Sequence, residues 1–554
     1  MKILDGKIID ARHDAFESHP RLGEHLAGAV VRALSSGTSK HHIYDSSLQK
    51  SMDRGTFLAL CLALSDYIKK NMPRDARIGI ALPSGIAGNA VNIAAQMAGR
   101  VSVNINFTMG AEAARACFKK AGVKTVISAE KLREKVAQRT PEFPWPENFL
   151  DVSKILKSIG RKGVAKKLAA VRLLPASALI RIFGIPTEGG GKEASIIFTS
   201  GSEGEPKAAI LTHRNIMANC LQMDYTGIIP EGQSLHANLP LFHSFGQSIQ
   251  VWYTSIFVHP VVAVPSPLEV KQNFDAMEKG RSNVMISTPT FLRSYLKKGD
   301  PKQAESLRIV IAGAEKSPDG FKEAWEKKFP NSAYKEGYGL TEASPVVSVN
   351  LPEGIPLNPY RDYKTGTRPK SVGQLFAGMQ AAVISPETGE FLPLGEPGTL
   401  CLKGANVFGG YLGAPELNAE KFRDGWLITG DIASLDSDAF IYIRGRISRF
   451  SKIGGEMVPH ALVEEAVAKA LSQENSETQT VAVTCRESRT KGEELVLVTT
   501  LDIDMPALRK SLVDSGISNL WIPKVVIKVD EIPTLASGKL SLGDLRKIAK
   551  NAQA

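Results

Sequence analysis

A short segment rich in glycine and hydroxyl side chains, residues 198–211, reads FTSGSEGEPKAAIL. Backbone N–H groups and small hydroxyls in such a loop converge on one point, which suits the oxygen atoms of a polyphosphate. The residues that would surround a phosphate are Thr199, Ser200, Gly201, Ser202, Gly204 and Lys207. They do not form a Walker A loop, because the lysine lacks the required glycine spacing and the Ser or Thr that follows it. Taken alone, a loop of this kind is more often a surface turn.

Later segments supply side chains that could complete a nucleotide site. In EGYGLTEASP, residues 336–345, the ring of Tyr338 could stack on a base. The hydroxyl of Thr341 could reach a phosphate, and the carboxylate of Glu342 could hold Mg²⁺.

Three more charged residues follow towards the C-terminus. A strand pattern in GWLITGDIA, residues 425–433, leads to Asp431, whose carboxylate can accept hydrogen bonds from both hydroxyls of a ribose. Arg446 follows in the next strand, and Lys539 lies on the glycine-containing segment PTLASGKLS. Each has an ordinary alternative, such as a turn aspartate or a solvated lysine. Five such segments in this order favour a nucleotide site.

Alternating elements must position these residues. Short apolar runs predict strands over 76–83, 101–107 and 124–129, and helical patterns predict helices over 89–100 and 111–122. This βαβαβ rhythm predicts a parallel sheet with helices on its faces. The rhythm recurs in 194–200, 282–299 and 307–329.

The pattern changes after about residue 370, where shorter strands alternate with Gly/Pro turns. From about residue 447 a small α/β unit is predicted, with a helix over 457–471. Its predicted strands are 480–487, 493–500 and 524–533. A separate C-terminal domain is therefore expected.

Residues 154–181 carry eight Lys or Arg and no acidic residue. Leu156, Ile159, Leu168, Val171 and Leu174 fall on one face of a helix over this range. A basic amphipathic helix can lie on an anionic membrane, which would place the protein at the inner face of the membrane. The alternative is a connecting helix that packs on its own domain.

The composition bounds the class of protein. Hydrophobic residues make up 43% and charged residues 23%, as in ordinary globular proteins. The formal net charge of +11 favours anionic partners, but no motif for nucleic-acid recognition is present. The five cysteines are scattered, so neither a zinc site nor a disulfide framework is predicted. Without a signal-peptide pattern or a long apolar run, we expect a cytoplasmic protein.

Together, the five segments resemble the adenylate-forming superfamily, which contains acyl-CoA synthetases, adenylation domains of peptide synthetases and luciferases. The resemblance runs from about residue 45 to 546. It implies an α/β fold with a large N-terminal AMP-binding and acyl-binding domain, residues 1–446, built of parallel α/β sheets and a small β-barrel. A small, mobile C-terminal α/β lid domain, residues 447–554, would follow.

Within the superfamily, FTSGSEGEPK, LPLFHSFG, IAGAEK, EGYGLTEASPVVSVN and RFSKIGGEMV resemble one subgroup. This is the acyl-ACP synthetase half of the bifunctional 2-acylglycerophosphoethanolamine acyltransferase/acyl-ACP synthetases. There, an acyltransferase domain with a His-x4-Asp motif precedes the synthetase half. Here none of the ten histidines has Asp five positions later. We therefore expect a ligase whose acyltransferase is a separate protein.

The resemblance implies a reaction in two halves. A long-chain fatty carboxylate attacks the α-phosphate of MgATP and gives an acyl-adenylate and pyrophosphate. The phosphopantetheine thiol of acyl carrier protein then takes the acyl group and AMP leaves, which would feed phospholipid acylation. ATP and Mg²⁺ are the implied cofactors, and the fatty acid and holo-acyl carrier protein, or CoA, the implied partners.

The resemblance also assigns roles in nucleotide binding. Residues 199–207 would grip the β- and γ-phosphates. Gly313, Ala314 and Glu315 would border the adenine, with Tyr338 against its face.

The remaining nucleotide contacts are implied in the same way. Thr341 would contact the α-phosphate and Glu342 would hold Mg²⁺. Asp431 would bind the ribose hydroxyls, with Arg446 beside it.

The C-terminal domain would supply two lysines. Lys539 would bridge the acyl carboxylate and the α-phosphate, and neutralise charge that develops in the transition state. The hinge of the family falls at Ile447 and Ser448 here, and rotation about it would bring in Lys452 for thioester formation.

The acyl group would lie against Phe242 and His243 of PLFHSFG, and Trp252 would line the same pocket. The apolar stretch 250–258 fits either a tunnel for a long chain or plain core. Periodicity does not separate these alternatives.

Three positions depart from the usual superfamily pattern. Glu203 stands where most members have Thr, although it matches the acyl-ACP synthetase subgroup. Ala208 replaces Gly after the lysine, and Ser448 replaces Asp or Lys at the hinge.

Two alternative functions remain open at this point: a long-chain acyl-CoA synthetase, and a non-catalytic lipid-binding protein that has kept the fold.

Overall fold

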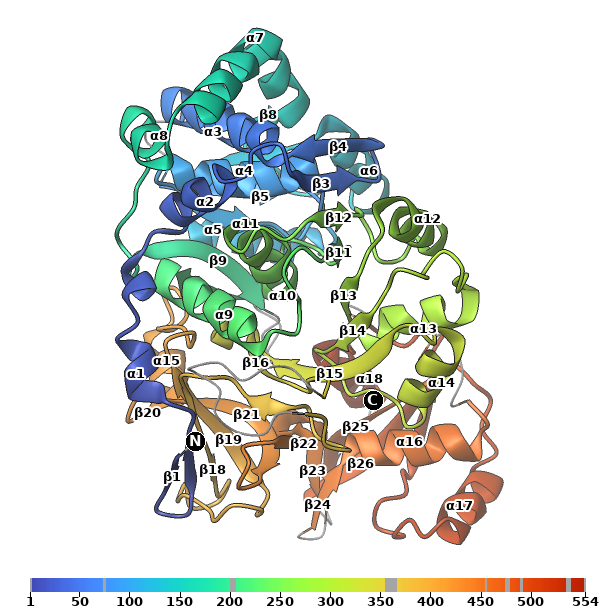
Figure 1. Cartoon of the computed structure of the whole chain (residues 1–554). Coiled ribbons are helices and arrows are strands. Elements are labelled where there is room, and N and C mark those ends of the chain that lie inside the picture. The colour runs from blue at the N-terminus through green and yellow to red at the C-terminus, as the bar shows by residue number, and fades with distance from the viewer. Residues whose placement is uncertain are drawn as a thin grey trace.

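The computed structural model describes residues 2–72, 76–199, 206–353, 366–453, 456–473, 479–488, 492–534 and 540–552. The strands in these ranges form four sheets (Figure 1). The first three are built from the chain up to Arg446, and the fourth from the chain after it. The protein thus has the expected α/β architecture, a large N-terminal part followed by a small C-terminal unit.

The predicted βαβαβ rhythm builds the first sheet, in the strand order β10-β9-β6-β5-β7-β8. Its elements are β5 (Arg77–Ala81), α4 (Ile86–Met97), β6 (Val101–Asn104), α5 (Ala111–Ala121), β7 (Thr125–Ser128), α6 (Glu130–Arg139), β8 (Asn148–Asp151), β9 (Glu193–Thr199) and β10 (Lys207–Thr212). All neighbours pair in parallel except β9 and β10, which are antiparallel. The predictions of strands and helices over 76–129 are confirmed.

The second sheet has nine strands in the order β17-β16-β15-β14-β13-β11-β12-β3-β4. The strands are β3 (His41–Asp45), β4 (Lys50–Asp53), β11 (Leu235–Ala237), β12 (Val261–Ala263), β13 (Val284–Ser287), β14 (Ile309–Ala312), β15 (Ala333–Gly339), β16 (Val346–Val349) and β17 (Gln374–Leu375). The same part of the chain forms the helices α9 (His213–Thr226), α10 (Ser244–Gln247), the π-helix η2 (Ser248–Tyr253), α11 (Thr254–Ile256), α12 (Val270–Gly280), α13 (Pro289–Lys298), α14 (Phe321–Lys328) and the short η3 (Thr341–Ala343). Its central strands are parallel, so their carboxyl ends share one edge.

The third sheet is antiparallel and has seven strands, and it stands where the small β-barrel was expected. It contains β1 (Lys2–Leu4), β2 (Ile8–Asp10), β18 (Met379–Ile384), β19 (Gly398–Gly404), β20 (Phe422–Arg423), β21 (Trp426–Leu435) and β22 (Ile441–Arg446), with α15 (Pro415–Lys421) beside it. The remaining N-terminal helices are α1 (His13–Glu17), η1 (Pro20–Gly23), α2 (Leu26–Leu34) and α3 (Arg54–Asn71).

The C-terminal unit is a five-stranded sheet with its own hydrophobic clusters. Its elements are η4 (Ile447–Arg449), β23 (Phe450–Ile453), β24 (Glu456–Pro459), α16 (His460–Ala470), β25 (Val481–Ser488), β26 (Gly492–Thr499), α17 (Met505–Asp514), β27 (Val525–Lys528) and α18 (Leu542–Asn551). The helix and strands predicted here are confirmed. The boundary between residues 446 and 447 stays a prediction.

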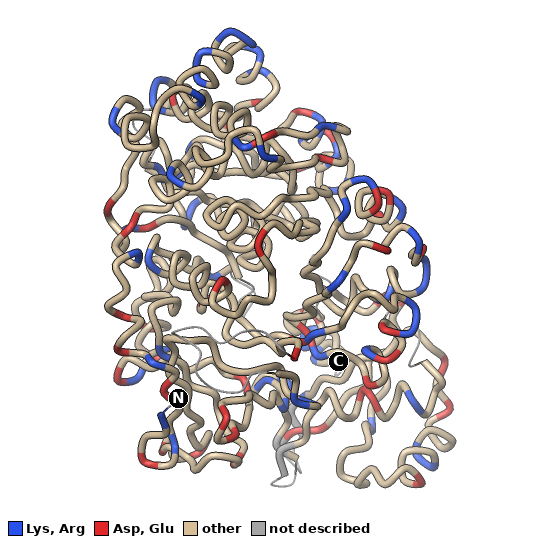
Figure 2. The backbone as a smooth tube through the Cα atoms, viewed as in Figure 1, with Lys and Arg blue, Asp and Glu red and all other residues tan. Residues whose placement is uncertain are grey.

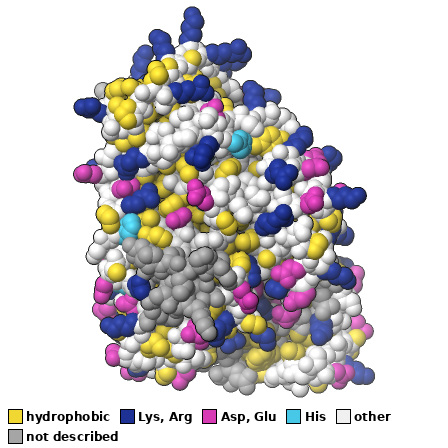
Figure 3. Space-filling view, viewed as in Figure 1, with side chains coloured by type: hydrophobic (Ala, Val, Ile, Leu, Met, Phe, Trp, Pro, Cys, Tyr) yellow, Lys and Arg dark blue, Asp and Glu magenta, His cyan; other side chains and the backbone are white. Residues whose placement is uncertain are grey.

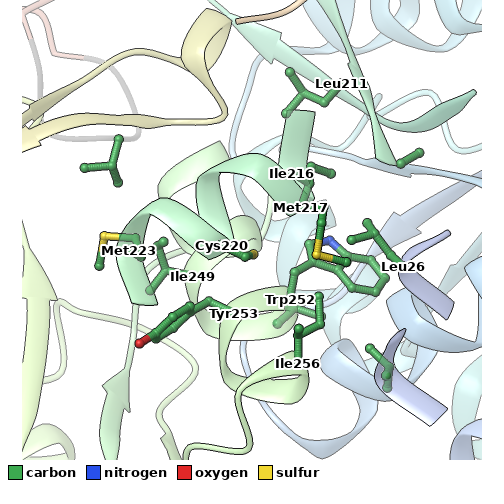
Figure 4. Packing of buried hydrophobic residues seen from close by; sticks show 14 of the residues in the cluster. Leu26, Leu211, Ile216, Met217, Cys220, Met223, Ile249, Trp252, Tyr253 and Ile256 are labelled. Atoms are coloured by element: carbon green, nitrogen blue, oxygen red, sulfur yellow. The ribbon is translucent and has the colours of Figure 1, made fainter. Parts of the chain in front are cut away.

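The main core of the N-terminal part joins helices to the first two sheets. Trp252 of η2 is fully buried, and Figure 4 shows it between Leu26, Met217 and Ile256. Helices α2, α9 and α11 therefore meet around one indole ring, which packs them as one layer.

The basic segment is not the continuous helix that the sequence predicts. Helix α7 (Val152–Leu173) is interrupted at Gly160, which has a left-handed φ of 66°, and Pro175 separates it from α8 (Ala176–Phe183). The apolar face expected from the pattern packs inward, mainly on α3. The alternative of a connecting helix therefore describes this face correctly. None of the helices in the described ranges combines the length and apolar character that a membrane crossing requires.

One buried histidine is expected to make the stability of the fold depend on pH. His42 on β3 is 1% exposed, and its ring lies 4.6 Å from the ring of Phe57 on α3, measured between centroids. Within the described residues, neither ring nitrogen has a hydrogen-bond partner. Burial, assisted by the charge of Arg54, lowers the pKa of His42 from 6.5 to about 3.

This lowered pKa predicts a loss of stability in mild acid. Below pH 6.5 the unfolded chain binds a proton at His42 that the folded chain does not, so stability falls as the pH drops towards the folded pKa of about 3. This group alone should remove about 2 kcal/mol between pH 7 and pH 5. We expect His42→Leu to flatten the pH dependence of the urea midpoint over that range. Equal slopes for the variant and the wild type would contradict the assignment.

Candidate nucleotide-binding active site

The candidate site lies at the carboxyl ends of β14 and β15. Gly313, Ala314 and Glu315 follow β14 directly, and a Cβ atom on Gly313 would lie 3.1 Å from the carbonyl oxygen of Gly337 on β15. Ala314 has a left-handed φ of 71°, which turns the chain away from the strand direction. Two neighbouring strand ends therefore leave a shared edge of the kind where α/β proteins bind ligands.

Asp431 is the centre of the site. Its side chain is 4% exposed, and its two oxygens have different partners. The hydroxyl of Tyr338 donates to Oδ2 at 2.5 Å, and Nε of Arg446 donates to Oδ1 at 2.7 Å. Burial, and then the charge of Asp431, raise the pKa of Tyr338 well above its usual value, so the hydroxyl keeps its proton. The charge of Asp431 likewise raises the pKa of Arg446.

The strand register explains why these side chains meet. Asp431 on β21 stands directly opposite Arg446 on the antiparallel strand β22. Opposite charges at such a cross-strand pair attract each other. Tyr338 comes from the second sheet, so the Asp431 carboxylate joins two sheets at one point.

Glu342 is connected to the phosphate segment through a residue that the sequence analysis did not identify. The hydroxyl of Tyr411 donates to Oε1 of Glu342 at 2.5 Å. The ring centroid of Tyr411 lies 5.9 Å from Nζ of Lys207. Burial, and then the charge of Glu342, raise the pKa of Tyr411, which keeps it a donor. Tyr411 thus bridges the predicted Mg²⁺ ligand and the predicted phosphate lysine.

Backbone hydrogen bonds hold Tyr411 in this place. The N–H group of Leu412 donates to the carbonyl of Ala208 at 2.8 Å, and Ala209 pairs with Tyr411. The turn that contains Tyr411 is therefore hydrogen-bonded to strand β10, which begins at Lys207. Ala208, which replaces the usual Gly of the superfamily, still accepts this hydrogen bond through its carbonyl.

The ends of the phosphate segment are adjacent. Thr199 and Lys207 are partners in the antiparallel register of β9 and β10, so the described residues on either side of the segment lie next to each other. Several predicted residues lie outside the described residues, namely Ser200, Gly201, Ser202, Gly204 and Lys539. Lys452 is on β23, but its side chain is also outside them.

The predicted acyl residues are divided between the site and the core. Oγ of Ser244 lies 3.1 Å from Oγ1 of Thr341, which places the PLFHSFG segment next to the predicted α-phosphate contact. Phe242 and His243 precede it, with ring centroids 4.8 Å apart, and Phe107 packs edge-on against Phe242. These residues lie together beside the site.

Trp252 has a different environment. Its side chain is fully buried in the N-terminal core, against α2 and α9 (Figure 4). All residues of η2 are buried in the same way. The core alternative therefore describes η2, and the role of Trp252 in an acyl pocket stays a prediction.

Glu315 and the hinge residues have clear local contacts. The hydroxyl of Thr290 donates to Oε2 of Glu315 at 2.5 Å, which fixes the turn after β14 to α13.

The predicted hinge residues Ile447 and Ser448 lie in η4, and Arg546 of α18 donates to the carbonyl of Ser448 at 3.2 Å. Lys316 makes an ion pair of 3.2 Å with Glu465 of α16, between the N-terminal part and the C-terminal unit.

The site fits a Mg²⁺ ion that arrives with its nucleotide. Among the described residues, no three His, Cys, Asp or Glu side chains gather into a metal site. Mg²⁺ is commonly held by one or two carboxylates together with phosphate oxygens and water. Glu342 would supply one such carboxylate, and its partner Tyr411 lies near the amine of Lys207, which could bind the same phosphates.

Ser244, Tyr411 and Lys421 are the site residues that sequence reasoning missed. In the sequence Tyr411 belongs only to the Gly-rich turn FGGYLG, and no motif contains Lys421. No spacing pattern in the sequence marks them, because their partners are distant along the chain.

Tyr338→Phe tests the role of Asp431. The change removes the 2.5 Å hydrogen bond while Arg446 still holds the carboxylate. We expect AMP affinity to fall about fivefold to tenfold in calorimetry, since a charge-assisted hydrogen bond is lost. The control is Tyr334→Phe on the same strand, which loses a hydrogen bond to Ser317 of 2.8 Å but not a site contact. Equal AMP affinities for Tyr338→Phe and the wild type would contradict the prediction.

Comparison with known proteins agrees with this geometry. Residues 39–412 match the model of a family described as AMP-binding enzyme. The mitochondrial medium-chain acyl-CoA ligase ACSF2 of Rattus norvegicus is 27% identical over 519 residues, 88% of this chain and 81% of that protein. A long-chain-fatty-acid–CoA ligase of Bacillus subtilis is 29% identical over 358 residues, 63% of this chain and 60% of that protein.

A solved structure extends the agreement to the whole fold. ATP-bound MatB from Rhodopseudomonas palustris superimposes with a TM-score of 0.76 at 23% identity, covering 95% of this chain and 100% of that chain. At this identity the likeness concerns the fold. Because the family match covers more than half of the sequence, the chain belongs to the AMP-binding enzyme family.

Proposed function

We propose that the protein is an ATP-dependent acid–thiol ligase that activates a long-chain fatty acid as its acyl-adenylate. The observation that carries the proposal is the buried Asp431 carboxylate, held by Tyr338 and Arg446. Thr341, which follows β15 shortly after Tyr338, adds a hydroxyl. A ribose, a base and an α-phosphate need these groups in one place.

The first half-reaction joins a carboxylate to AMP. A carboxylate oxygen attacks the α-phosphorus, and the bond from that phosphorus to the bridging oxygen of pyrophosphate breaks. In the second half-reaction a thiolate attacks the acyl carbon, the acyl–oxygen bond breaks, and AMP leaves. Bound Mg²⁺ would neutralise phosphate charge during the first half.

The described residues position the substrates rather than react with them. The Asp431 carboxylate can accept hydrogen bonds from ribose hydroxyls on the lone pairs that Tyr338 and Arg446 leave available. Lys207, at the start of β10, can hold the outer phosphates. Positioning and charge stabilisation of this kind are the main means of catalysing phosphoryl and nucleotidyl transfer.

Two features of the C-terminal unit belong to the proposal. We assign residues 1–446 to the nucleotide and acyl domain and 447–554 to a lid that rotates about Ile447 and Ser448. Lys539 would act in adenylation and Lys452 in thioester formation. The Lys316–Glu465 ion pair between the two parts would have to break when the lid rotates.

The thiol that we propose is the phosphopantetheine of acyl carrier protein, because five segments resemble the acyl-ACP synthetase subgroup. In that case the product would supply phospholipid acylation. CoA is the second candidate, since the similar proteins named above are CoA ligases. The two acceptors carry the same reactive group, so only a direct competition separates them.

The proposed activity can be tested with both acceptors together. With MgATP, a saturated long-chain fatty acid, and equal holo-acyl carrier protein and CoA, we expect acylated carrier protein and pyrophosphate, read by intact mass and a phosphate assay. Lys539→Ala should reduce pyrophosphate release about 100-fold or more. The control is Lys547→Ala, an exposed lysine of α18 that pairs with Asp544.

Each contrary outcome has a distinct meaning. Acyl-CoA as the product would show that CoA is the acceptor and would leave the proposed adenylation chemistry unchanged. Full activity in Lys539→Ala would remove the role of that lysine. An absence of pyrophosphate release from the wild type at every chain length would favour a non-catalytic lipid-binding protein.

We also propose that the segment 154–181 contacts an anionic membrane through its outer face. Helices α7 and α8 form one end of the molecule, and Figures 2 and 3 show Lys and Arg along it. Leu173 and Ile182 are 81% and 61% exposed at this end. Because the inner apolar face packs on α3, the contact would be mainly electrostatic, with these two side chains adding apolar area.

Vesicle flotation tests this contact. Replacement of Lys157, Arg161 and Lys162 by Gln should lower binding to vesicles that contain anionic lipid by about tenfold or more, since each surface cation contributes about 1 kcal/mol. The control replaces the exposed Lys271, Lys322 and Lys327 by Gln, which gives a variant of the same net charge as the test variant. Equal binding to anionic and neutral vesicles would refute the proposal.

A further inference from the structure

Helix α15 is fixed to the turn that carries Tyr411. The N–H group of Tyr411 donates to Oδ1 of Asn418 at 2.7 Å, and Nδ2 of Asn418 donates back to the carbonyl of Tyr411 at 3.0 Å. One side-chain amide thus satisfies both backbone groups of the residue that binds Glu342. The helix is therefore positioned by the site and not only by the sheet beside it.

Lys421 is three residues after Asn418, so the two lie on the same face of α15. Its half-buried amine donates to the carbonyl of Ile428 at 3.5 Å, a long hydrogen bond. The same Nζ atom is 3.9 Å from the position that a Cβ on Gly430 would take. The amine therefore lies beside the part of β21 that leads directly into Asp431.

The charges of the site act on this amine. Burial lowers the pKa of Lys421, the carboxylates of Glu342 and Asp431 oppose the change, and the cations Lys207 and Arg446 add to it. Within the described part of the chain, no ion pair joins Lys421 to either carboxylate. The positive charge of Lys421 thus interacts electrostatically with both carboxylates, but Lys421 does not form an ion pair with either of them.

Among the described residues, the charged groups around Lys421 have a surplus of positive charge. With Lys421 itself they are the cations Lys207 and Arg446 and the carboxylates Glu342 and Asp431, which makes three cations and two carboxylates. Arg446 is already bound to Asp431, and Glu342 accepts a hydrogen bond from Tyr411. A partly buried lysine with most of its donors unused, in a cluster of net positive charge, suits an anion that enters the site.

We propose that Lys421 is a further phosphate-binding residue of this site, whose amine binds the polyphosphate of ATP on the side of Glu342. The inference rests on the proposed function, because it presumes that ATP binds here. It adds a second lysine to Lys207, from a helix that the phosphate segment does not contain. Asn418 acts as a positioning residue, since it fixes α15 to Tyr411.

Calorimetry with adenosine, AMP and ATP, in the presence of Mg²⁺, tests the assignment without turnover. Lys421→Met keeps the length and apolar stem of the side chain but removes the charge. We expect it to weaken ATP binding about tenfold, as for loss of a charge-assisted hydrogen bond, and to change adenosine binding less than about twofold. Lys421→Arg should restore most of the ATP affinity.

A matched control is Lys403→Met on the neighbouring strand β19. Lys403 is also half-buried, and its amine lies 3.7 Å from the Cβ position of Gly425, which precedes β21, whereas Lys421 lies next to Gly430. We expect wild-type affinities for this variant. A tenfold loss in Lys403→Met as well would mean that any buried lysine of this sheet affects binding, and would overturn the specific role.

The remaining outcomes separate this inference from the proposed function. Wild-type protein that does not bind ATP would overturn both. ATP affinity unchanged in Lys421→Met, with the wild type binding normally, would overturn only the role of Lys421. Equal losses for adenosine and ATP would show that the substitution disturbs α15, and would likewise overturn a contact with phosphate.

Discussion

A single buried carboxylate holds the nucleotide site together. Asp431 lies almost fully out of contact with solvent, and a charge in such a place is stable only when it is paired and hydrogen-bonded. Tyr338 and Arg446 meet this requirement from the end of β15 and from β22. Because these partners belong to two different sheets, the carboxylate both satisfies its own charge and fixes how the sheets approach one another.

The other polar groups of the site are also held by contacts between residues of different structural elements. Tyr411 joins Glu342 to Lys207, Asn418 joins Tyr411 to α15, and the register of β9 and β10 brings both ends of the phosphate segment together. Each contact crosses from one structural element to another. Contacts of this kind hold polar groups in place before a nucleotide enters, which is how positioning contributes to catalysis.

Most of the regular elements around the site could be predicted from the sequence, because buried parallel strands and amphipathic helices have strong periodicity. The order of motifs also pointed to Tyr338, Asp431 and Arg446, whose side chains meet in the structure, and to Glu342. Tyr411 could not be predicted, since its role depends on a contact with a residue far away in the chain. The prediction of one continuous helix over the basic segment is wrong, because Gly160 and Pro175 break the helix and its apolar stripe packs against the rest of the protein. Periodicity shows that a face is apolar, and does not show what covers it.

The assignment of Asp431 as the ribose-binding group is tested most directly by comparing AMP with 2′,3′-dideoxy-AMP in calorimetry, in the wild type and in Asp431→Ala. The wild type should bind AMP at least about tenfold more tightly, because the carboxylate accepts hydrogen bonds from the ribose hydroxyls. Asp431→Ala should bind both nucleotides with the same reduced affinity. Equal affinities in the wild type, or a preference for AMP that survives in Asp431→Ala, would contradict a nucleotide site centred on this residue.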